Sequence, residues 1–190
     1  YLTEIKGRAA GLIQFVIQAM SGIPSVVAGL FIFTALIVTT PIKQSSLAAG
    51  FALSILMIPT VTRTAQEVLL LIPNDLREAG LAMGATQWKT VSTIVIPAAR
   101  SGLITATILG VARIAGETAP LIFTLGITDK VNANPFHDWN SALPMYVWKG
   151  LLLGSNESIQ RAWSAILVLL IFILILFVTA RSLGSRSFRK

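Results

Sequence analysis

The sequence predicts an all-α, polytopic membrane protein built as a bundle of about four transmembrane helices. Apolar residues make up 54% of the chain and charged residues only 12%, whereas soluble domains carry about 25% charged residues. Four apolar segments approach the roughly 20 residues that a helix needs to cross the hydrocarbon core. Lysine and arginine cluster at the ends of these segments, as they do in multi-pass membrane proteins.

The first two predicted spans are each marked by a proline. The first runs from about 23 to 42, with Pro24 where the first turn of a helix tolerates proline. The second runs from about 47 to 62 and carries Pro59 near its end. Before the first span, residues 8–20 place apolar side chains at helical spacing. They predict either a helix on the membrane surface or an extension of the first span that is kinked near Pro24.

The other two spans flank a long outer segment. The third span, 102–125, contains two charged residues, and the fourth, 162–180, contains none. Between them, 126–158 is irregular and holds prolines, tryptophans and a tyrosine. These aromatics predict an interfacial belt, and the alternative is a surface that receives an extracytoplasmic partner. Within it, 142–153 predicts a re-entrant or interfacial helix.

The lysines and arginines predict the orientation of the chain. Four spans bring three basic regions to one side, which should be the cytoplasm because cytoplasmic loops carry an excess of basic residues. The C-terminus is then cytoplasmic. The ten residues on that side are Lys6, Arg8, Arg63, Arg77, Lys89, Arg100, Arg181, Arg186, Arg189 and Lys190, and the four on the other are Lys43, Lys130, Lys149 and Arg161.

Composition also excludes several classes of function. The net charge of +7 arises at the ends of spans, without a basic patch interleaved with aromatics, so no nucleic-acid partner is expected. The chain has no cysteine and one histidine, His137, so neither a disulfide framework nor a metal site is expected. Serines in the apolar segments have no histidine in the same span, so nucleophilic catalysis is not expected.

We interpret residues 1–190 as a single transmembrane domain. The first residue is Tyr1 rather than methionine, and the N-terminus lacks the basic-then-apolar layout of a signal peptide. The chain is therefore expected to be the downstream part of a longer protein.

The loop between the second and third spans contains a polar, helix-like stretch. Asn74 or Asp75 can accept hydrogen bonds from the free amides of a first helical turn, and Glu78 stands where it could complete a capping box with Asp75. A short membrane loop has little reason to build such a helix unless a partner docks there. The alternative is an amphipathic connector that rests on the bilayer surface.

This loop helix, predicted over 74–87, has one face with small residues that would let a partner approach closely. Gly84 is expected to end the helix or to admit the partner. The residues on that face are Leu76, Ala79 or Gly80, Met83 and Gln87.

Arg113 and Glu117 form a predicted charged pair in the middle of the third span. A charge at this depth costs at least about 2.5 kcal/mol, and the spacing of four residues lets the two side chains pair on one helix face. The planar guanidinium of Arg113 suits an oxyanion, while Glu117 could orient it, repel the wrong ion or accept a proton. Gly116 and Pro120 favour a local break in the helix. The alternative is a neutralising pair that only lets the helix insert or locks helices together.

Two motifs resemble those of known permeases. The loop is similar to the Glu-Ala-Ala signature of ABC importer permeases, although Gly80 and Ile96 depart from it. Residues 112–124 resemble the Ala-Arg-x-x-Gly-Glu-Thr-Ala-Pro-Leu-x-Phe-Thr segment of phosphate importer permeases of the PstA type, as do 1–4 and 23–30 more briefly. The positions that match the loop signature are Glu78, Ala79, Gly84, Ile94 and Pro97.

The resemblance implies a MetI-like permease of a bacterial plasma membrane that imports inorganic phosphate. It implies a second related permease, separate ATPase subunits that hold ATP and Mg²⁺, and an extracytoplasmic phosphate-binding protein, with about two spans missing upstream. The chain lacks a phosphate-binding glycine-rich loop with lysine, in keeping with a separate ATPase. The implied substrate pathway is Arg113, Glu117 and Thr118, and the implied ATPase-coupling residues are Asp75, Glu78, Ala79, Gly80 and Gly84. Alternatives are another cargo (molybdate, sulfate or an amino acid) and a membrane scaffold without a pore.

Overall fold

The structure is a computed structural model that describes residues 8–130 and 132–186, and within these ranges all regular structure is helical. The expected motif at 1–4 and the basic residues Lys6, Arg189 and Lys190 lie outside the described residues. In chain order the helices are α1 (Arg8–Ser21), α2 (Ser25–Ile32), the π-helix η1 (Phe33–Val38), α3 (Ser46–Leu70), α4 (Asn74–Ala82), α5 (Gln87–Thr90), the π-helix η2 (Val91–Val95), α6 (Ile96–Ile114), α7 (Ala119–Thr124), α8 (Leu143–Leu153) and α9 (Asn156–Arg186).

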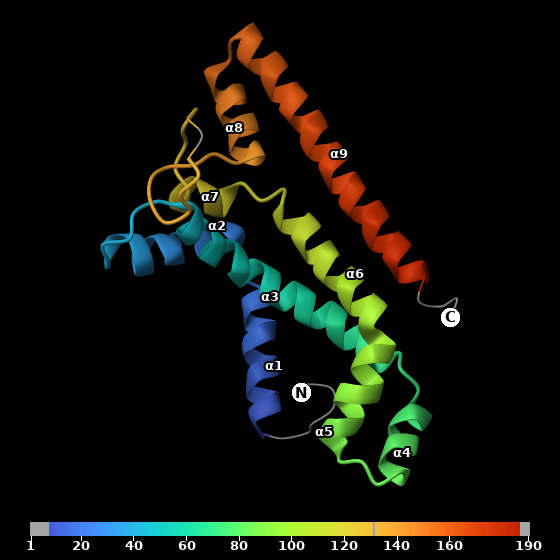
Figure 1. The fold of residues 1–190 in the computed structure, drawn as a ribbon. Coiled ribbons are helices and arrows are strands. Elements are labelled where there is room, and N and C mark those ends of the chain that lie inside the picture. Colours follow the sequence, from blue (N-terminus) through green and yellow to red (C-terminus); the bar gives the residue numbers. More distant parts are fainter. Residues whose placement is uncertain (1–7, 131, 187–190) are drawn as a thin grey trace.

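Three long helices, α3, α6 and α9, form the body of the molecule (Figure 1). α6 packs between α3 and α9, and α8 packs on α9. Figure 1 shows α4 and α5 at one end of this body, with α7 and α8 at the other. Three helices of the described part are long and apolar enough to cross a membrane, or four if the bent pair around residues 22–24 is one span. The predicted all-α membrane bundle is confirmed.

The first predicted span, 23–42, is shorter in the structure, where its helical part is Ser25–Val38, and the chain bends just before it, near the predicted kink at Pro24. α1 confirms the predicted helix at 8–20, but the segments Ala9–Ser21 and Ser25–Val38 meet at 106°. The bend falls where Gly22 and Ile23 leave the helix and Pro24 takes an extended ψ of 141°. Proline has no N–H to continue the hydrogen bonds of α1, so a new helix starts after it.

The second and third spans also have different bounds from those predicted. α3 continues through Pro59 as far as Leu70, beyond the predicted end at residue 62. Helical hydrogen bonding does not stop where the apolar pattern stops, and α3 continues through the more polar residues that follow Thr62. The third span begins at Gln87 and ends at Ile114, before a break that separates it from α7. The predicted fourth span lies inside α9, and α8 confirms the short helix predicted at 142–153.

α3 and α6 pack closely where valines of α3 face glycines of α6, and we call these contacts the valine–glycine seam. An ideal Cβ at Gly102 would lie 2.4 Å from Val68 Cγ1, and one at Gly110 would lie 2.4 Å from Val61 Cγ2. Each valine therefore occupies space that only a glycine on the facing helix leaves open. Small residues at helix interfaces permit this close approach in membranes.

The outer segment is fastened to the bundle by a small core. Met145 of α8 is fully buried in a cluster with Ala49, Leu121 and Leu125. By contrast, the apolar side chains of α9 point largely outward, since only 11% of its most apolar window is buried. An outward apolar face is what a lipid-facing helix requires.

Candidate functional site

Arg113 lies in the last turn of α6, beside the middle of α3. Its Nη1 donates a hydrogen bond to Thr60 Oγ1 at 3.0 Å. A cation in the last helical turn is favoured by the carbonyl dipoles there. A guanidinium has five N–H donors, so the bond to Thr60 leaves most of them available to another group.

Arg113 and Arg63 both line one cavity of about 290 Å³, which we call the two-arginine cavity. α3 forms most of its wall, Arg113 enters from α6, and the third side comes from the end of α1 and the turn after it. No aspartate or glutamate from the part of the chain described in the structure lines the cavity, so two positive charges face it without a compensating carboxylate. The lining residues are Met20, Ser21, Ile23, Leu56, Pro59, Thr60, Arg63, Thr64 and Arg113.

The hydroxyl groups of this cavity are already engaged as donors. Ser21 donates to the Gln18 carbonyl at 2.7 Å, and Thr60 and Thr64 donate to carbonyls one helical turn earlier at 3.2 and 3.1 Å. An anion would compete with these bonds for the hydroxyl protons. The two guanidiniums are therefore its main donors, and the arrangement favours a small oxyanion.

Arg63 is the site residue that the sequence analysis missed. It was assigned to the cytoplasmic loop because the apolar pattern ends at Thr62. The available signal was its helical spacing from Thr60, since residues three apart share a helix face if α3 continues through them. Recognising Arg63 as a cavity residue requires knowing that α3 continues as far as Leu70.

Glu117 and Thr118 do not join Arg113 in the cavity. The predicted pairing of Arg113 with Glu117 on one helix face is wrong here, because α6 ends at Ile114 and no ion pair joins the two among the described residues. Both Glu117 and Thr118 are half-buried in the break between α6 and α7. The break itself was predicted correctly from Gly116 and Pro120, and it removes the continuous turn on which pairing depended.

The loop helix is α4, which is shorter than the predicted 74–87. It ends at Ala82, Gly84 adopts a left-handed φ of 79°, and Gln87 belongs to α5. The predicted capping box is absent, because Pro73 is the N-cap and no side chain caps the first turn. Asp75 instead lies in the first turn, where a carboxylate is stabilised by the helix dipole.

Ala79 and Gly80 of α4 face different ways. Gly80 is buried against the chain itself: an ideal Cβ there would lie 2.6 Å from Thr90 Cγ2 and 3.0 Å from Ile94 Cδ1. Ala79 is exposed together with Asp75 and Glu78. Of the alternatives at 79 and 80, the structure therefore leaves Ala79 available to a partner. We define the docking face of α4 as Leu76, Ala79 and Met83, of which Met83 is 87% exposed.

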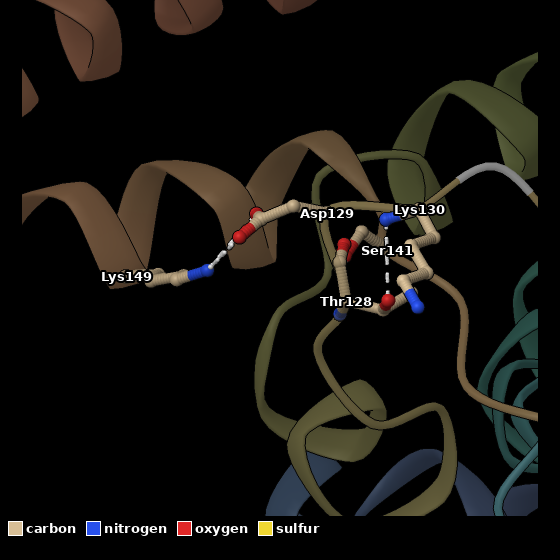
Figure 2. A network of polar contacts seen from close by, with 5 residues as sticks. All are labelled: Thr128, Asp129, Lys130, Ser141 and Lys149. Carbon is tan, nitrogen blue, oxygen red and sulfur yellow. Dashed lines mark hydrogen bonds and ion pairs between the residues drawn. The ribbon is translucent and has the colours of Figure 1, made fainter.

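The outer segment contains a second polar cluster, shown in Figure 2. Lys149 Nζ donates to both carboxylate oxygens of Asp129 at 2.9 Å, which ties α8 to the segment that follows α7. The Thr128 N–H donates to Ser141 Oγ at 3.0 Å across the same segment. An open cavity of about 780 Å³ lies beside this cluster, opposite the end that carries α4.

Comparison with known proteins agrees with this architecture. A family model described as "Binding-protein-dependent transport system inner membrane component" matches residues 2–188. The "Phosphate transport system permease protein PstA 1" of Mycobacterium tuberculosis (strain CDC 1551 / Oshkosh) is 37% identical over 174 residues, or 91% of this chain. The "Phosphate transport system permease protein PstA" of Haemophilus influenzae is 36% identical over 188 residues, or 95% of this chain. The chain spans 57% and 64% of the lengths of these two relatives.

A solved structure shares the fold. It is described as inward-facing conformations of the MetNI methionine ABC transporter, and it matches with a TM-score of 0.71 at 21% identity. The match covers 95% of this chain and 74% of that one. The predicted MetI-like arrangement of helices is confirmed.

Proposed function

Because the chain belongs to the binding-protein-dependent transport system inner membrane components, we propose that it is a permease subunit of an ATP-driven importer of inorganic phosphate. One observation carries this proposal: Arg63 and Arg113 line a single cavity beside the middle of α3, and none of the described residues that line it is an aspartate or a glutamate. Curated relatives that are named phosphate permeases support the choice of cargo.

The cavity suits a small, multiply hydrogen-bonding anion. Its volume of about 290 Å³ is at the lower limit of small-molecule sites, which span about 300–1,000 Å³. Guanidinium groups bind phosphate oxygens in paired, charge-assisted hydrogen bonds. Arg113 would bind the anion directly, Arg63 would supply the second charge, and Thr60 would hold Arg113 in place. Glu117 and Thr118 would act on the pathway from the break between α6 and α7, outside this cavity.

The exposed features at the two ends of the bundle support two of the proposed partners, the ATPase and the binding protein. The docking face of α4 would receive a separate ATPase subunit that binds ATP and Mg²⁺, with Asp75, Glu78, Gly80 and Gly84 shaping or supporting it. A second related permease would complete the pathway. The outer cluster around Lys149 would receive an extracytoplasmic phosphate-binding protein, and α9 would face lipid of the bacterial plasma membrane with its C-terminus in the cytoplasm.

The proposal is tested with the complete transporter. Purification through a tag on this chain should recover an ATPase and a second permease. In proteoliposomes, ATP and the cognate binding protein should drive uptake of labelled phosphate, with little uptake of sulfate, molybdate or amino acids. Preferential uptake of one of those solutes would reject the cargo, and recovery of the chain without an ATPase would favour a scaffold.

Substitution of Gly84 tests the docking role of α4. Gly84→Val should lower the amount of ATPase that co-purifies several-fold. The left-handed φ of residue 84 costs a non-glycine residue roughly 1–2 kcal/mol, so the backbone would leave this conformation and change the direction of the Met83 side chain. No neighbouring atom lies within 4 Å, so a clash inside the chain is not the cause. Gly84→Asn is the control, since asparagine tolerates this conformation. Unchanged ATPase recovery and transport in Gly84→Val would count against docking at α4.

Charge reversal at Lys149 tests the outer surface. Lys149→Glu should change the stability of the protein by no more than about 1 kcal/mol, because exposed ion pairs contribute little, yet it should weaken the stimulation of ATP hydrolysis by the binding protein. The Asp129 side chain is 75% exposed, in keeping with a small stability effect. Asp129→Lys combined with Lys149→Asp restores the pair and should restore stimulation if the pair orders this surface. Normal stimulation in Lys149→Glu would exclude Lys149 from the interface.

A further inference from the structure

Arg77 connects α4 to the preceding helix in a way that its sequence position does not suggest. It is a residue of α4, but its guanidinium donates to the Leu69 carbonyl at 2.9 Å and to the Ile72 carbonyl at 2.6 Å. These carbonyls lie in the last turn of α3 and just beyond it. The last four carbonyls of a helix have no partner within the helix, and α3 has no basic residue in its own last turn. Arg77 therefore provides from α4 the cation that completes the end of α3.

A second contact holds α4 on its other side. Gly80 is seated against Thr90 and Ile94, which belong to the stretch that leads into α6. α4 packs mainly on η2 and α5. The short loop after Leu70 and the Arg77 hydrogen bonds therefore attach α4 to the end of α3, while Gly80 attaches it to the α6 side.

We propose that Arg77 is a positioning residue for transport: it transmits displacement of α4 to α3, and through α3 to the two-arginine cavity. The proposal rests on the proposed function. α3 carries Arg63 and Thr60 in the cavity wall, and the valine–glycine seam makes α6 and Arg113 move with α3. α3, α4 and α6 then move as one body, and the cavity changes shape at its remaining wall, around Ser21 and the turn after α1.

Variants of the complete transporter test this transmission. Arg77→Gln removes the charge and the fork of donors, so the complex should keep its ATPase and still hydrolyse ATP, but import about tenfold fewer anions per ATP. Arg77→Lys should be intermediate, because an ammonium group cannot reproduce the paired geometry. Arg100→Gln removes an exposed charge from α6 and should match the wild type. Normal coupling in Arg77→Gln would overturn the proposal. Loss of the ATPase from that variant would also overturn it, since Arg77 would then maintain the docking surface.

A distance measurement tests the same step independently of cargo. The chain has no cysteine, so spin labels at Ser54→Cys in α3 and Ala82→Cys in α4 report on these two helices when the partners are also cysteine-free. In the wild type the distance distribution should be narrow and unchanged between the nucleotide-free and vanadate-trapped states. In Arg77→Gln this distance distribution should broaden. If the Arg77→Gln chain does not fold, the same broadening is expected in Arg77→Lys.

The two proposals fail in different ways. A wild-type distance that changes with nucleotide, or an unchanged distribution in the Arg77 variants, would overturn the coupling role. Absence of phosphate uptake by the wild type would instead reject the proposed cargo, and the label distances would still decide the role of Arg77.

Discussion

Replacement of Arg113 by glutamine should abolish phosphate uptake while the transporter still assembles. The side chain would lose its positive charge and its paired donors, and hydrogen bonds to charged groups contribute about 1.5–3 kcal/mol each. Loss of two such bonds corresponds to a fall in uptake of at least about 100-fold. The measurement is the initial rate of labelled phosphate uptake into proteoliposomes, together with the recovery of the ATPase and the second permease.

Three further variants separate the roles around the cavity. Arg63→Gln should also reduce uptake strongly, because it removes the second charge on the cavity. Thr60→Val should have a smaller effect, since it removes the 3.0 Å bond that positions Arg113 and the Thr60 bond to a backbone carbonyl of α3, but neither positive charge. Arg100→Gln removes a charge outside the cavity and should transport normally. Normal uptake in Arg113→Gln would contradict the assignment of this cavity to the substrate pathway.

Sequence patterns were sufficient for the fold because lipid and helical hydrogen bonding act locally. The apolar segments, the helix at residues 8–20, the helix at 142–153 and the break around Gly116 could all be predicted from composition and spacing. The bounds were less accurate, because hydropathy reports where a helix leaves lipid rather than where its hydrogen bonds end. That difference is why α3 was ended at 62 and why Arg63 was placed in a loop.

The candidate site depended on contacts between segments far apart in the chain. Arg113 meets Thr60 across 53 positions, and no local pattern indicates that α3 is the neighbour of α6. Likewise, Arg77 was treated as a marker of orientation, because its two carbonyl partners become visible only when the position of α4 relative to the end of α3 is known. A charged residue that is explained by a topology rule can therefore also have a specific structural partner.

The valine–glycine seam should also be important to transport, because it sets the position of Arg113 relative to α3. Gly110 lies one helical turn before Arg113, and an added Cβ would approach Val61 Cγ2 to 2.4 Å. Gly110→Ala should force α3 and α6 apart at a cost of about 1–3 kcal/mol and move Thr60 away from Arg113. We expect uptake to fall by roughly tenfold or more. Gly50→Ala is the matched control in α3, since no neighbouring atom lies within 4 Å of its added methyl group.

A compensating change distinguishes displacement from general damage to the bundle. Val61→Ala removes the methyl groups that Gly110→Ala would strike, so the double variant should recover most of the uptake that Gly110→Ala loses. In a double-mutant cycle, residues in direct contact typically couple by about 0.5–3 kcal/mol. If the losses of Gly110→Ala and Val61→Ala were simply additive, close packing of α3 on α6 would not be what holds Arg113 in position. Recovery in the double variant would mean that the separation of the two helices, rather than the glycine itself, sets the geometry of the two-arginine cavity.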